Sequence, residues 1–234
     1  MKKRWPLAAM LTLTLILSPS AWAADTHSFQ REAMVRKQIL ERGITDGTTL
    51  TAMRTVPRHL FVSPALTDSA YEDRPLPIGY GQTISQPYIV AFMTEKIRPK
   101  AGHKVLEIGS GSGYQAAVLA SIVKEVYTIE IIEELGHIVR DRLQRLRYGN
   151  VRVRVADGYD GWPEQAPFDA IVVTAAAEHV PPSLIRQLKD GGRMVIPVGS
   201  PFLVQSLMLV EKDQGNIKTT SLLPVRFVPF RRGR

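Results

Sequence analysis

Cysteine is absent from the 234-residue chain. Its absence excludes a disulfide framework, a thiolate metal site and a cysteine nucleophile. Histidine and tryptophan are scarce, with five and three residues. His103, His137 and His179 share no spacing typical of a metal site, so no bound metal is expected. Trp5 and Trp22 both fall within the first 23 residues, outside the part of the chain that is expected to fold.

Long hydrophobic runs are also lacking. The most apolar stretch, Leu7–Leu17, is too short to span a bilayer as a helix. It follows the basic segment Lys2–Arg4 and precedes the small-x-small sequence Ala21-Trp22-Ala23, which together are typical of a secretory signal peptide. We therefore expect residues 1–23 to direct export, with the periplasm as the destination. An uncleaved N-terminal anchor or a misassigned start codon is the alternative.

The overall composition is that of an ordinary globular protein. The chain is 44% hydrophobic and 22% charged, which is enough for a sizeable core and short enough for one domain. The net charge is +8, and the residues after the expected signal carry +5 of it. This modest excess gives little support for a nucleic-acid partner. The terminal run Arg231-Arg232-Gly233-Arg234 is expected to be a solvated end.

The region before residue 100 is predicted to contain helices and a long loop. Phe29–Arg42 and Thr48–Arg54 are predicted helices, and Val56–Phe61 is expected to be extended because it contains a proline. Residues 64–87 hold four further prolines and form an irregular segment. Loops of that length in a compact domain are usually functional lids. A helix is predicted over Tyr88–Ile97.

Strands and helices alternate in the second part of the chain. The predicted strands, which are mostly continuous apolar runs, are Lys104–Gly109, Glu125–Ile131, Val151–Asp157, Phe168–Thr174, Arg193–Val198, Ser206–Glu211 and one within Thr219–Val228. The predicted helices are Tyr114–Ile122, Ile132–Leu146, Tyr159–Gln165 and Pro182–Leu188. This alternation predicts an α/β fold, with a doubly wound, mostly parallel seven-stranded sheet. The final strands lack intervening helices and are expected to form an antiparallel edge hairpin.

A glycine-rich turn follows the first of these strands. Val105–Ile108 is a predicted buried strand, and Gly109-Ser110-Gly111-Ser112-Gly113 then turns the chain into the next helix. Glycines let the backbone approach a ligand closely, and the start of a helix offers free N–H groups. We therefore expect Gly109, Ser110, Gly111 and Gly113 to contact a bound cofactor.

Three acidic residues fall at the ends of consecutive predicted strands, where open α/β sheets bind ligands. Glu107 precedes the glycine turn, and Glu130 lies 19 positions beyond Gly111. That spacing is typical of a carboxylate that accepts hydrogen bonds from ribose hydroxyls. Asp157, followed by Gly158, is placed to accept from an exocyclic amine such as that of adenine. Each acid alone is better explained as a helix N-cap or a solvated strand end, but together the three favour an adenosine site.

Two adenosine cofactors fit this pattern. Gly111–Ala116 matches the loose dinucleotide motif G-x-G-x-x-A, so a nicotinamide dinucleotide is one of them. Two features favour S-adenosyl-L-methionine. Glu107 beside the turn would repel a pyrophosphate but attract a sulfonium and its amino group. The overlapping G-x-G-x-G pattern is the form usual in methyltransferases.

Several further stretches carry a resemblance to one family. They are Val56–Val62, Ala70–Asp73, Pro75–Pro87, Val105–Gly113, Ala166–Ile171, Gly191–Gly199 and Val225–Pro229. On these stretches the chain resembles the protein-L-isoaspartate O-methyltransferases, over roughly residues 31–230. The stretch Gly81–Pro87 is the most specific of them. The resemblance implies a Rossmann-like methyltransferase fold in a single domain of residues 24–234. Residues 24–100 would form the N-terminal helices and substrate lid, and residues 101–230 the cofactor-binding sheet.

The resemblance also implies a reaction and its residues. The protein would transfer a methyl group from S-adenosyl-L-methionine to the free α-carboxylate of L-isoaspartyl residues in damaged proteins and peptides, which initiates their repair. Ser85 would be the catalytic residue and would also bind substrate. Arg226 would help to hold the substrate, and Gln82, Thr83 and Ile84 would wall the cofactor from solvent. The residues alone leave open a helix cap for Ser85 and a surface ion pair for Arg226.

Some features leave alternatives open. Ala156 and Ser63 stand where the family commonly has glycine and proline, and the family is mostly cytoplasmic, whereas residues 1–23 predict export. The alternatives are a methyltransferase for another carboxylate or a small molecule, and a non-catalytic exported protein that binds adenosine. We expect isoaspartyl proteins and peptides as partners, no nucleic acid, no stable membrane insertion after signal cleavage, and a monomer.

Overall fold

A computed structural model describes residues 27–200 and 202–233. The predicted signal, residues 1–23, therefore lies outside the described residues. Within the described ranges, no helix is both long enough and apolar enough to cross a membrane.

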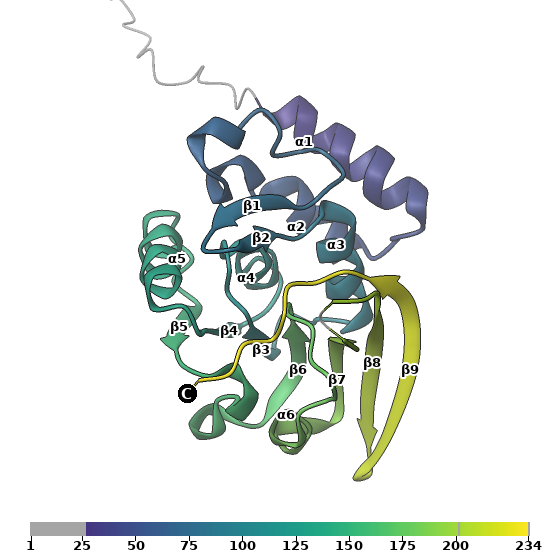
Figure 1. The fold of residues 1–234 in the computed structure, drawn as a ribbon. Helices are drawn as coiled ribbons and strands as arrows, with labels where there is room; N and C mark the ends of the chain where they lie inside the picture. The colour runs from purple at the N-terminus through teal and green to yellow at the C-terminus, as the bar shows by residue number, and fades with distance from the viewer. Residues whose placement is uncertain (1–26, 201, 234) are drawn as a thin grey trace, which may run out of the picture.

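Seven strands form one sheet in the order β5-β4-β3-β6-β7-β8-β9 (Figure 1). Their bounds are β3 Lys104–Ile108, β4 Glu125–Glu130, β5 Val151–Val155, β6 Phe168–Val173, β7 Leu188–Val198, β8 Gln205–Asp213 and β9 Asn216–Val225. Strands β3 to β7 run parallel, and β8 and β9 are antiparallel. This confirms the predicted mostly parallel sheet with an antiparallel edge hairpin.

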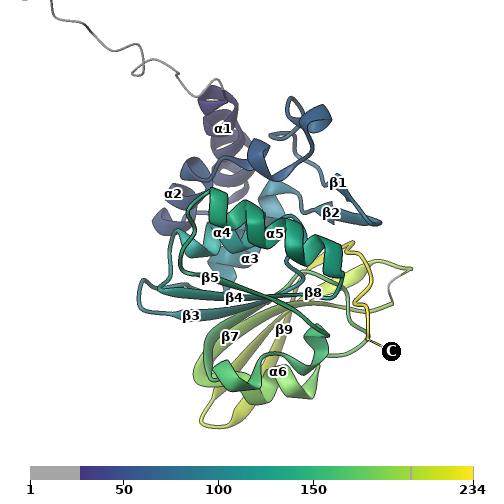
Figure 2. The same ribbon diagram turned by 90° about the vertical axis from the view of Figure 1, so that its left-hand side faces the viewer.

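Helices cover both faces of the sheet, as Figure 2 shows. On one side lie α3 (Pro87–Lys96), α4 (Tyr114–Ala120) and α5 (Glu133–Arg145), and on the other lies α6 (Pro182–Gln187). Successive side chains of the central strands point to opposite faces of the sheet. Val105 belongs to one apolar cluster and Leu106 to the other, and both are fully buried. Burial on both faces explains why these strands are continuous apolar runs.

One predicted helix, Tyr159–Gln165, is wrong. The segment instead forms two short 3₁₀ turns, η6 (Gly158–Asp160) and η7 (Pro163–Gln165). Gly161 between them has φ +66°, and Pro163 cannot continue a helix from the preceding turn. Gly161 therefore ends η6, and Pro163 begins η7 as a separate turn.

The N-terminal region packs above the sheet in Figure 1. Its first helical segment comprises α1 (Ser28–Met34), the π turn η2 (Val35–Ile39) and the 3₁₀ turn η3 (Leu40–Arg42). α2 (Gly47–Thr55) begins at Asp46, whose Oδ1 accepts a hydrogen bond from the Thr49 N–H at 2.7 Å. These helices agree with the predicted ones to within a few residues.

The segment after α2 departs from the prediction. Val56 is extended, as a residue before proline should be. Arg58–Phe61, however, forms the 3₁₀ turn η4, so the predicted extended stretch Val56–Phe61 is wrong beyond Pro57. A further 3₁₀ turn, η5, spans Pro64–Leu66.

The predicted lid contains a β-hairpin that the sequence did not predict. β1 (Leu76–Gly79) pairs antiparallel with β2 (Gln82–Ile84). Between them Tyr80 has φ +54° and Gly81 φ +70°, which is the conformation of a two-residue hairpin turn. In Figure 1 this hairpin lies between the N-terminal helices and the carboxyl ends of the sheet strands.

The turn between β8 and β9 is held by an aspartate from another strand. Asp190 lies in β7, and its two carboxylate oxygens accept hydrogen bonds from the N–H groups of Gln214 and Gly215 at 3.0 and 2.9 Å. After β9 the chain crosses the sheet beneath the hairpin and ends near the carboxyl end of β5 (Figure 1).

Candidate active site

A cavity lies at the carboxyl ends of β3, β4 and β6. The chain runs outward from β3 to β5 and then returns to β6 on the other side of β3, which makes this the switch point where α/β sheets bind ligands. Most of the predicted site residues line the cavity: Gln82, Thr83, Ile84, Ser85, Glu107, Gly109, Ser110, Gly111, Glu130 and Gly158.

The glycine turn is anchored on both sides. The N–H groups of Gly109 and Ser110 donate to the carbonyl oxygen of Ile129 in β4, at 2.8 and 3.1 Å. The Thr174 hydroxyl, just after β6, donates to the carbonyl oxygen of Gly109 at 2.7 Å. A Cβ atom on Gly109 would lie 2.5 Å from that hydroxyl, and Gly109 has φ +93°. Glycine is therefore required at this position for both conformation and space.

Glu107 is a fully buried carboxyl group in the wall of the cavity. The Thr128 hydroxyl donates to its Oε2 at 2.5 Å, while Oε1 has no hydrogen-bond partner among the described residues. Burial raises the pKa of Glu107 to about 8, with the nearby Glu130 adding to the rise and the Thr128 hydrogen bond opposing it. A cationic ligand in the cavity would supply the missing partner and favour the ionised form.

Glu130 is held by the backbone on both oxygens. Its Oε2 accepts from the Gly111 N–H at 2.9 Å, and its Oε1 accepts from the Ile132 N–H at 3.0 Å. Each oxygen keeps a second lone pair for a ligand in the cavity. The N–H of Gly111 is thereby already used, and two carboxyl groups line the cavity. Both features suit ribose hydroxyls and a cation better than a pyrophosphate.

Gly113 was expected to contact the cofactor, but it is not among the lining residues. It has φ +84° and precedes α4, and a Cβ there would lie 3.2 Å from Val139 of α5. A glycine at residue 113 is therefore explained by the positive φ of the turn and by the close packing of α4 against α5.

Asp157 was expected to accept from adenine, and it too lies outside the lining residues. Its Oδ1 accepts from the Tyr159 N–H at 2.9 Å, and its Oδ2 accepts from Arg232 Nε and the Gly233 N–H at 2.9 and 2.8 Å. Desolvation acts to raise the pKa of Asp157, but these hydrogen bonds outweigh it and hold the pKa below its usual range. Arg232 and Gly233 of the terminal basic run, which was expected to be solvated, thus bind Asp157.

A second cavity adjoins the first. Ser85, Thr83, Thr174 and Val228 line both cavities, and Arg226 lines the second one. Within the described ranges the Ser85 side chain makes no hydrogen bond. The cap of α3 is Gln86 and not Ser85, and it makes no side-chain capping bond. The alternative role of Ser85 as a helix cap is therefore wrong, and its hydroxyl is left on the wall between two cavities.

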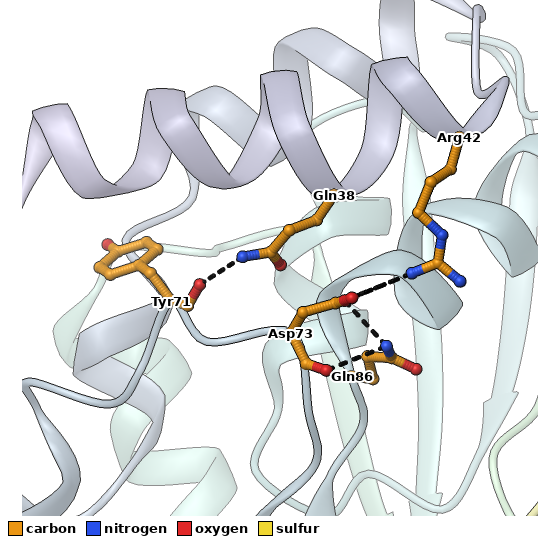
Figure 3. Close-up of polar contacts among 5 residues, drawn as sticks. All are labelled: Gln38, Arg42, Tyr71, Asp73 and Gln86. Carbon is orange, nitrogen blue, oxygen red and sulfur yellow. Dashed lines mark hydrogen bonds and ion pairs between the residues drawn. The ribbon is translucent and has the colours of Figure 1, made fainter.

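The position of Ser85 is held through its neighbour Gln86. Gln86 Nε2 donates to the carbonyl oxygen and to Oδ1 of Asp73, at 3.1 and 2.8 Å (Figure 3). The other carboxylate oxygen of Asp73 pairs with Arg42 at the end of the first helical segment, at 3.1 Å. Figure 3 also shows Gln38, whose amide donates to the carbonyl oxygen of Tyr71 at 2.7 Å. The N-terminal helices thus fix the loop that leads to the hairpin.

Several residues in or next to the site were not predicted from the sequence. Thr128 partners Glu107 and lies opposite it in the β3–β4 register, two residues before Glu130. Thr128 and Glu130 are two residues apart on one strand, which could have indicated that both side chains point to the same face of the sheet. Thr174 and the C-terminal residues Phe230 and Arg231 also line or close the cavity. No local sequence signal points to these residues, since they reach the site only through the sheet order.

Comparisons with known sequences agree on one family. The sequence profile described as protein-L-isoaspartate(D-aspartate) O-methyltransferase matches residues 29–234. A protein-L-isoaspartate O-methyltransferase of Opitutus terrae is 56% identical over 225 residues, covering 96% of this chain and 97% of that protein. Protein-L-isoaspartate O-methyltransferase 2 of a Polaromonas species is 61% identical over 201 residues, covering 85% and 95%.

Solved structures give the same result. A structure of a protein-L-isoaspartate O-methyltransferase has a TM-score of 0.77 and 31% identity, covering 85% of this chain and 65% of that chain. A Plasmodium falciparum structure described as the same type of enzyme in complex with S-adenosyl-L-homocysteine has a TM-score of 0.75 and 26% identity. That match covers 87% of this chain and 99% of the other.

Proposed function

The chain belongs to the protein-L-isoaspartate(D-aspartate) O-methyltransferase family, and from this premise we propose how its site carries out the family's reaction. The protein transfers a methyl group from S-adenosyl-L-methionine to the free α-carboxylate of L-isoaspartyl residues in damaged proteins and peptides, which initiates their repair. One observation carries the assignment of roles. Ser85 lies on the wall shared by an acid-lined cavity and a second cavity that contains Arg226.

The acid-lined cavity fits S-adenosyl-L-methionine by its donor and acceptor groups. Glu130 has lone pairs free for ribose hydroxyls, and the unpartnered Oε1 of Glu107 suits the amino group or sulfonium. Gln82, Thr83 and Ile84 of the hairpin would cover the cofactor from solvent. When bound, the cofactor supplies an electrophilic methyl group on a positively charged sulfur.

The methyl acceptor needs no general base. An α-carboxyl group has a reference pKa of about 3.5, so it is already ionised at neutral pH. The protein must instead orient the carboxylate and exclude water, since orientation alone is worth effective molarities of about 10⁵ M or more. The Ser85 hydroxyl would donate to one carboxylate oxygen and leave the other directed at the methyl group. Ser85 is a hydrogen-bond donor in this scheme and not a covalent nucleophile.

Arg226 would help to hold the substrate carboxylate or its flanking chain. It is exposed on the wall of the second cavity, and within the described residues it makes no ion pair. A free cation at this place complements an anionic acceptor and favours the substrate-binding role over the surface ion pair that the sequence left open.

The function is tested with a pair of peptides that differ only in an isoaspartyl or an aspartyl residue. The purified protein is expected to transfer labelled methyl from S-adenosyl-L-methionine to the isoaspartyl peptide alone. Ser85→Ala should reduce kcat/KM about 10- to 100-fold, because a hydrogen bond to a charged group is worth about 1.5–3 kcal/mol. Its affinity for S-adenosyl-L-homocysteine should stay within about twofold of the unchanged protein.

A matched control is Ser63→Ala. Ser63 is an exposed serine before η5 that makes no capping hydrogen bond, so its removal should leave methylation unchanged. Equal labelling of the two peptides would overturn the substrate assignment. Loss of cofactor affinity in Ser85→Ala would move Ser85 from the substrate to the cofactor side.

Two finer properties complete the proposal. We propose that residues 1–23 direct the protein to the periplasm, on the basis of their basic, apolar and small-x-small segments. We further propose that the protein acts as a monomer. Its partners are then isoaspartyl proteins and peptides, and it is not inserted in the membrane after signal cleavage.

A further inference from the structure

The C-terminal segment is attached to the sheet as far as Phe230. The Phe230 N–H donates to the carbonyl oxygen of Ala176 at 2.8 Å, and the Ala176 N–H donates to that of Val228 at 2.9 Å. Figure 1 shows the yellow segment crossing the carboxyl ends of the strands beneath the hairpin. Phe230 and Arg231 line the cofactor cavity as the chain passes. The segment is therefore a wall of the cofactor site.

Beyond Phe230 the segment is attached mainly through one side chain, Asp157. Arg232 Nε and the Gly233 N–H both donate to Oδ2 of Asp157. The Arg232 guanidinium also lies 3.7 Å from the centre of the Tyr159 ring, and Tyr159 is the residue whose N–H occupies Oδ1. Three donors thus surround the carboxylate, and two of them come from the last residues of the chain.

The sequence predicts Asp157 as the acceptor for the exocyclic amine of adenine. It lies two residues after β5, next to Gly158, which lines the cavity. An amine N–H seeks the same acceptor that the Arg232 and Gly233 N–H groups occupy. The terminal segment uses both lone pairs of Oδ2, and the Tyr159 N–H uses one of Oδ1, so adenine and the terminal segment compete for the acceptor strength of one carboxylate.

We propose that Arg232 is a residue that sets cofactor affinity, because Arg232 and adenine compete for the Asp157 carboxylate. This inference rests on the proposed adenosine site. The terminal segment acts as a latch with its hinge at Phe230, the last residue fixed to the sheet. Arg232 acts through Asp157 and is therefore a positioning residue.

The ion pair between Arg232 and Asp157 is weak enough for a bound ligand to displace it. Half of the Arg232 side chain is exposed, at 53%, so its ion pair with Asp157 is weakened by water and salt. An exposed ion pair of this kind changes an equilibrium by about two- to fivefold. A ligand that forms several new contacts can displace it, yet the pair still lowers the apparent affinity.

The test measures the affinity of S-adenosyl-L-homocysteine for the purified protein and for Arg232→Ala, at about 20 mM and 500 mM salt. We expect Arg232→Ala to bind about two- to fivefold more tightly at low salt. High salt screens the ion pair, so the difference should shrink there. Arg232→Lys keeps the charge and should stay close to the unchanged protein.

Arg154→Ala is the matched control. Arg154 is a second half-exposed arginine that pairs with a carboxylate, Glu164, at 3.0 Å and lies over an aromatic ring, that of Trp162. None of these residues lines the cofactor cavity, so the affinity should not change. Equal or weaker binding by Arg232→Ala at low salt would overturn this inference alone. Failure of the unchanged protein to bind the ligand would overturn both this inference and the proposed function.

Discussion

Glu107 is a buried acid that is protonated in part at neutral pH. Its carboxyl group is fully buried, one oxygen lacks a partner among the described residues, and its pKa is raised to about 8 by burial. A raised pKa favours folding at low pH and loses that advantage as the pH rises towards 8. A bound cation reverses the balance, since it attracts only the ionised carboxylate.

The affinity for S-adenosyl-L-methionine should therefore depend on pH through Glu107. Between pH 6 and pH 8 the ionised fraction of a group with a pKa of about 8 rises from about 1% to about 50%, so affinity should increase by roughly fiftyfold and level off above pH 8. Calorimetric titrations in two buffers of different ionisation enthalpy should also record proton release near pH 7.

Glu107→Gln is the variant for this test. It keeps the size and the hydrogen bond with Thr128 but cannot ionise. It should bind more weakly at pH 8 and show neither the pH dependence nor the proton release. A variant with the same pH dependence as the unchanged protein would show that another group titrates.

At the residue scale, the acidic residues at the ends of the strands could be predicted from the sequence. Glu107 and Glu130 follow from strand boundaries and from the distance to Gly111, both of which are local. The pairing of Arg232 with Asp157 could not be predicted, because 75 residues separate them and only the sheet order brings the terminus there. Gly113 was assigned to the cofactor because a turn glycine that packs against a helix has the same sequence signal as one that contacts a ligand.

Among the elements, the β1–β2 hairpin matters most for substrate selection. Its strands have only four and three residues, and β1 contains Pro77. Proline and glycine at this density predict irregular structure, so the hairpin was not predicted from the sequence. It forms because Tyr80 and Gly81 adopt positive φ and because Leu76 and Ile84 are buried.

The loop that leads to the hairpin depends on Asp73. Asp73→Ala removes the carboxylate that joins Gln86 to Arg42, so the Ser85 hydroxyl should be less well positioned. We expect kcat/KM for the isoaspartyl peptide to fall about three- to tenfold, the size of one or two partly exposed polar contacts. The affinity for S-adenosyl-L-homocysteine should change by less than about twofold.

Glu72→Ala is the control for Asp73→Ala. Glu72 is the preceding residue, and its carboxylate contacts Arg74 and Ser69 but not Gln86 or Arg42. Its removal should leave both constants unchanged. Similar losses in the two variants would mean that general loosening of the loop, and not the contact with Gln86, accounts for the effect.

For the whole molecule, the sheet was predicted better than the segments around it. Continuous burial makes strands such as β3 and β6 recognisable from apolar runs alone. The short 3₁₀ turns at Arg58–Phe61 and Gly158–Asp160 contain no comparable apolar run. One or two residues within each turn determine its conformation. The two cavities depend on the meeting of the hairpin, the sheet and the C-terminal segment, which no local pattern contains.

Export is a property of the whole chain. The native protein should be recovered from the periplasmic fraction, with a mature N-terminus at or near Ala24 when sequenced. A chain in which residues 24–234 follow a single initiator methionine should stay in the cytoplasm. An intact Met1 on native protein from the cytoplasm would contradict the export proposal.

The aspartate contacts described above bear on how the protein itself ages. Isoaspartate forms readily at Asp–Gly, because glycine has no side chain to hinder attack by its nitrogen on the aspartyl carbonyl. The chain has four such pairs, and in three of them backbone N–H groups hold the carboxylate, at Asp46, Asp157 and Asp190. In the fourth pair, Asp160–Gly161, the aspartate is exposed at the end of η6 and its carboxylate accepts no hydrogen bond within the described ranges, although Gly161 is buried. The repair enzyme's own weakest point against this damage is therefore Asp160–Gly161.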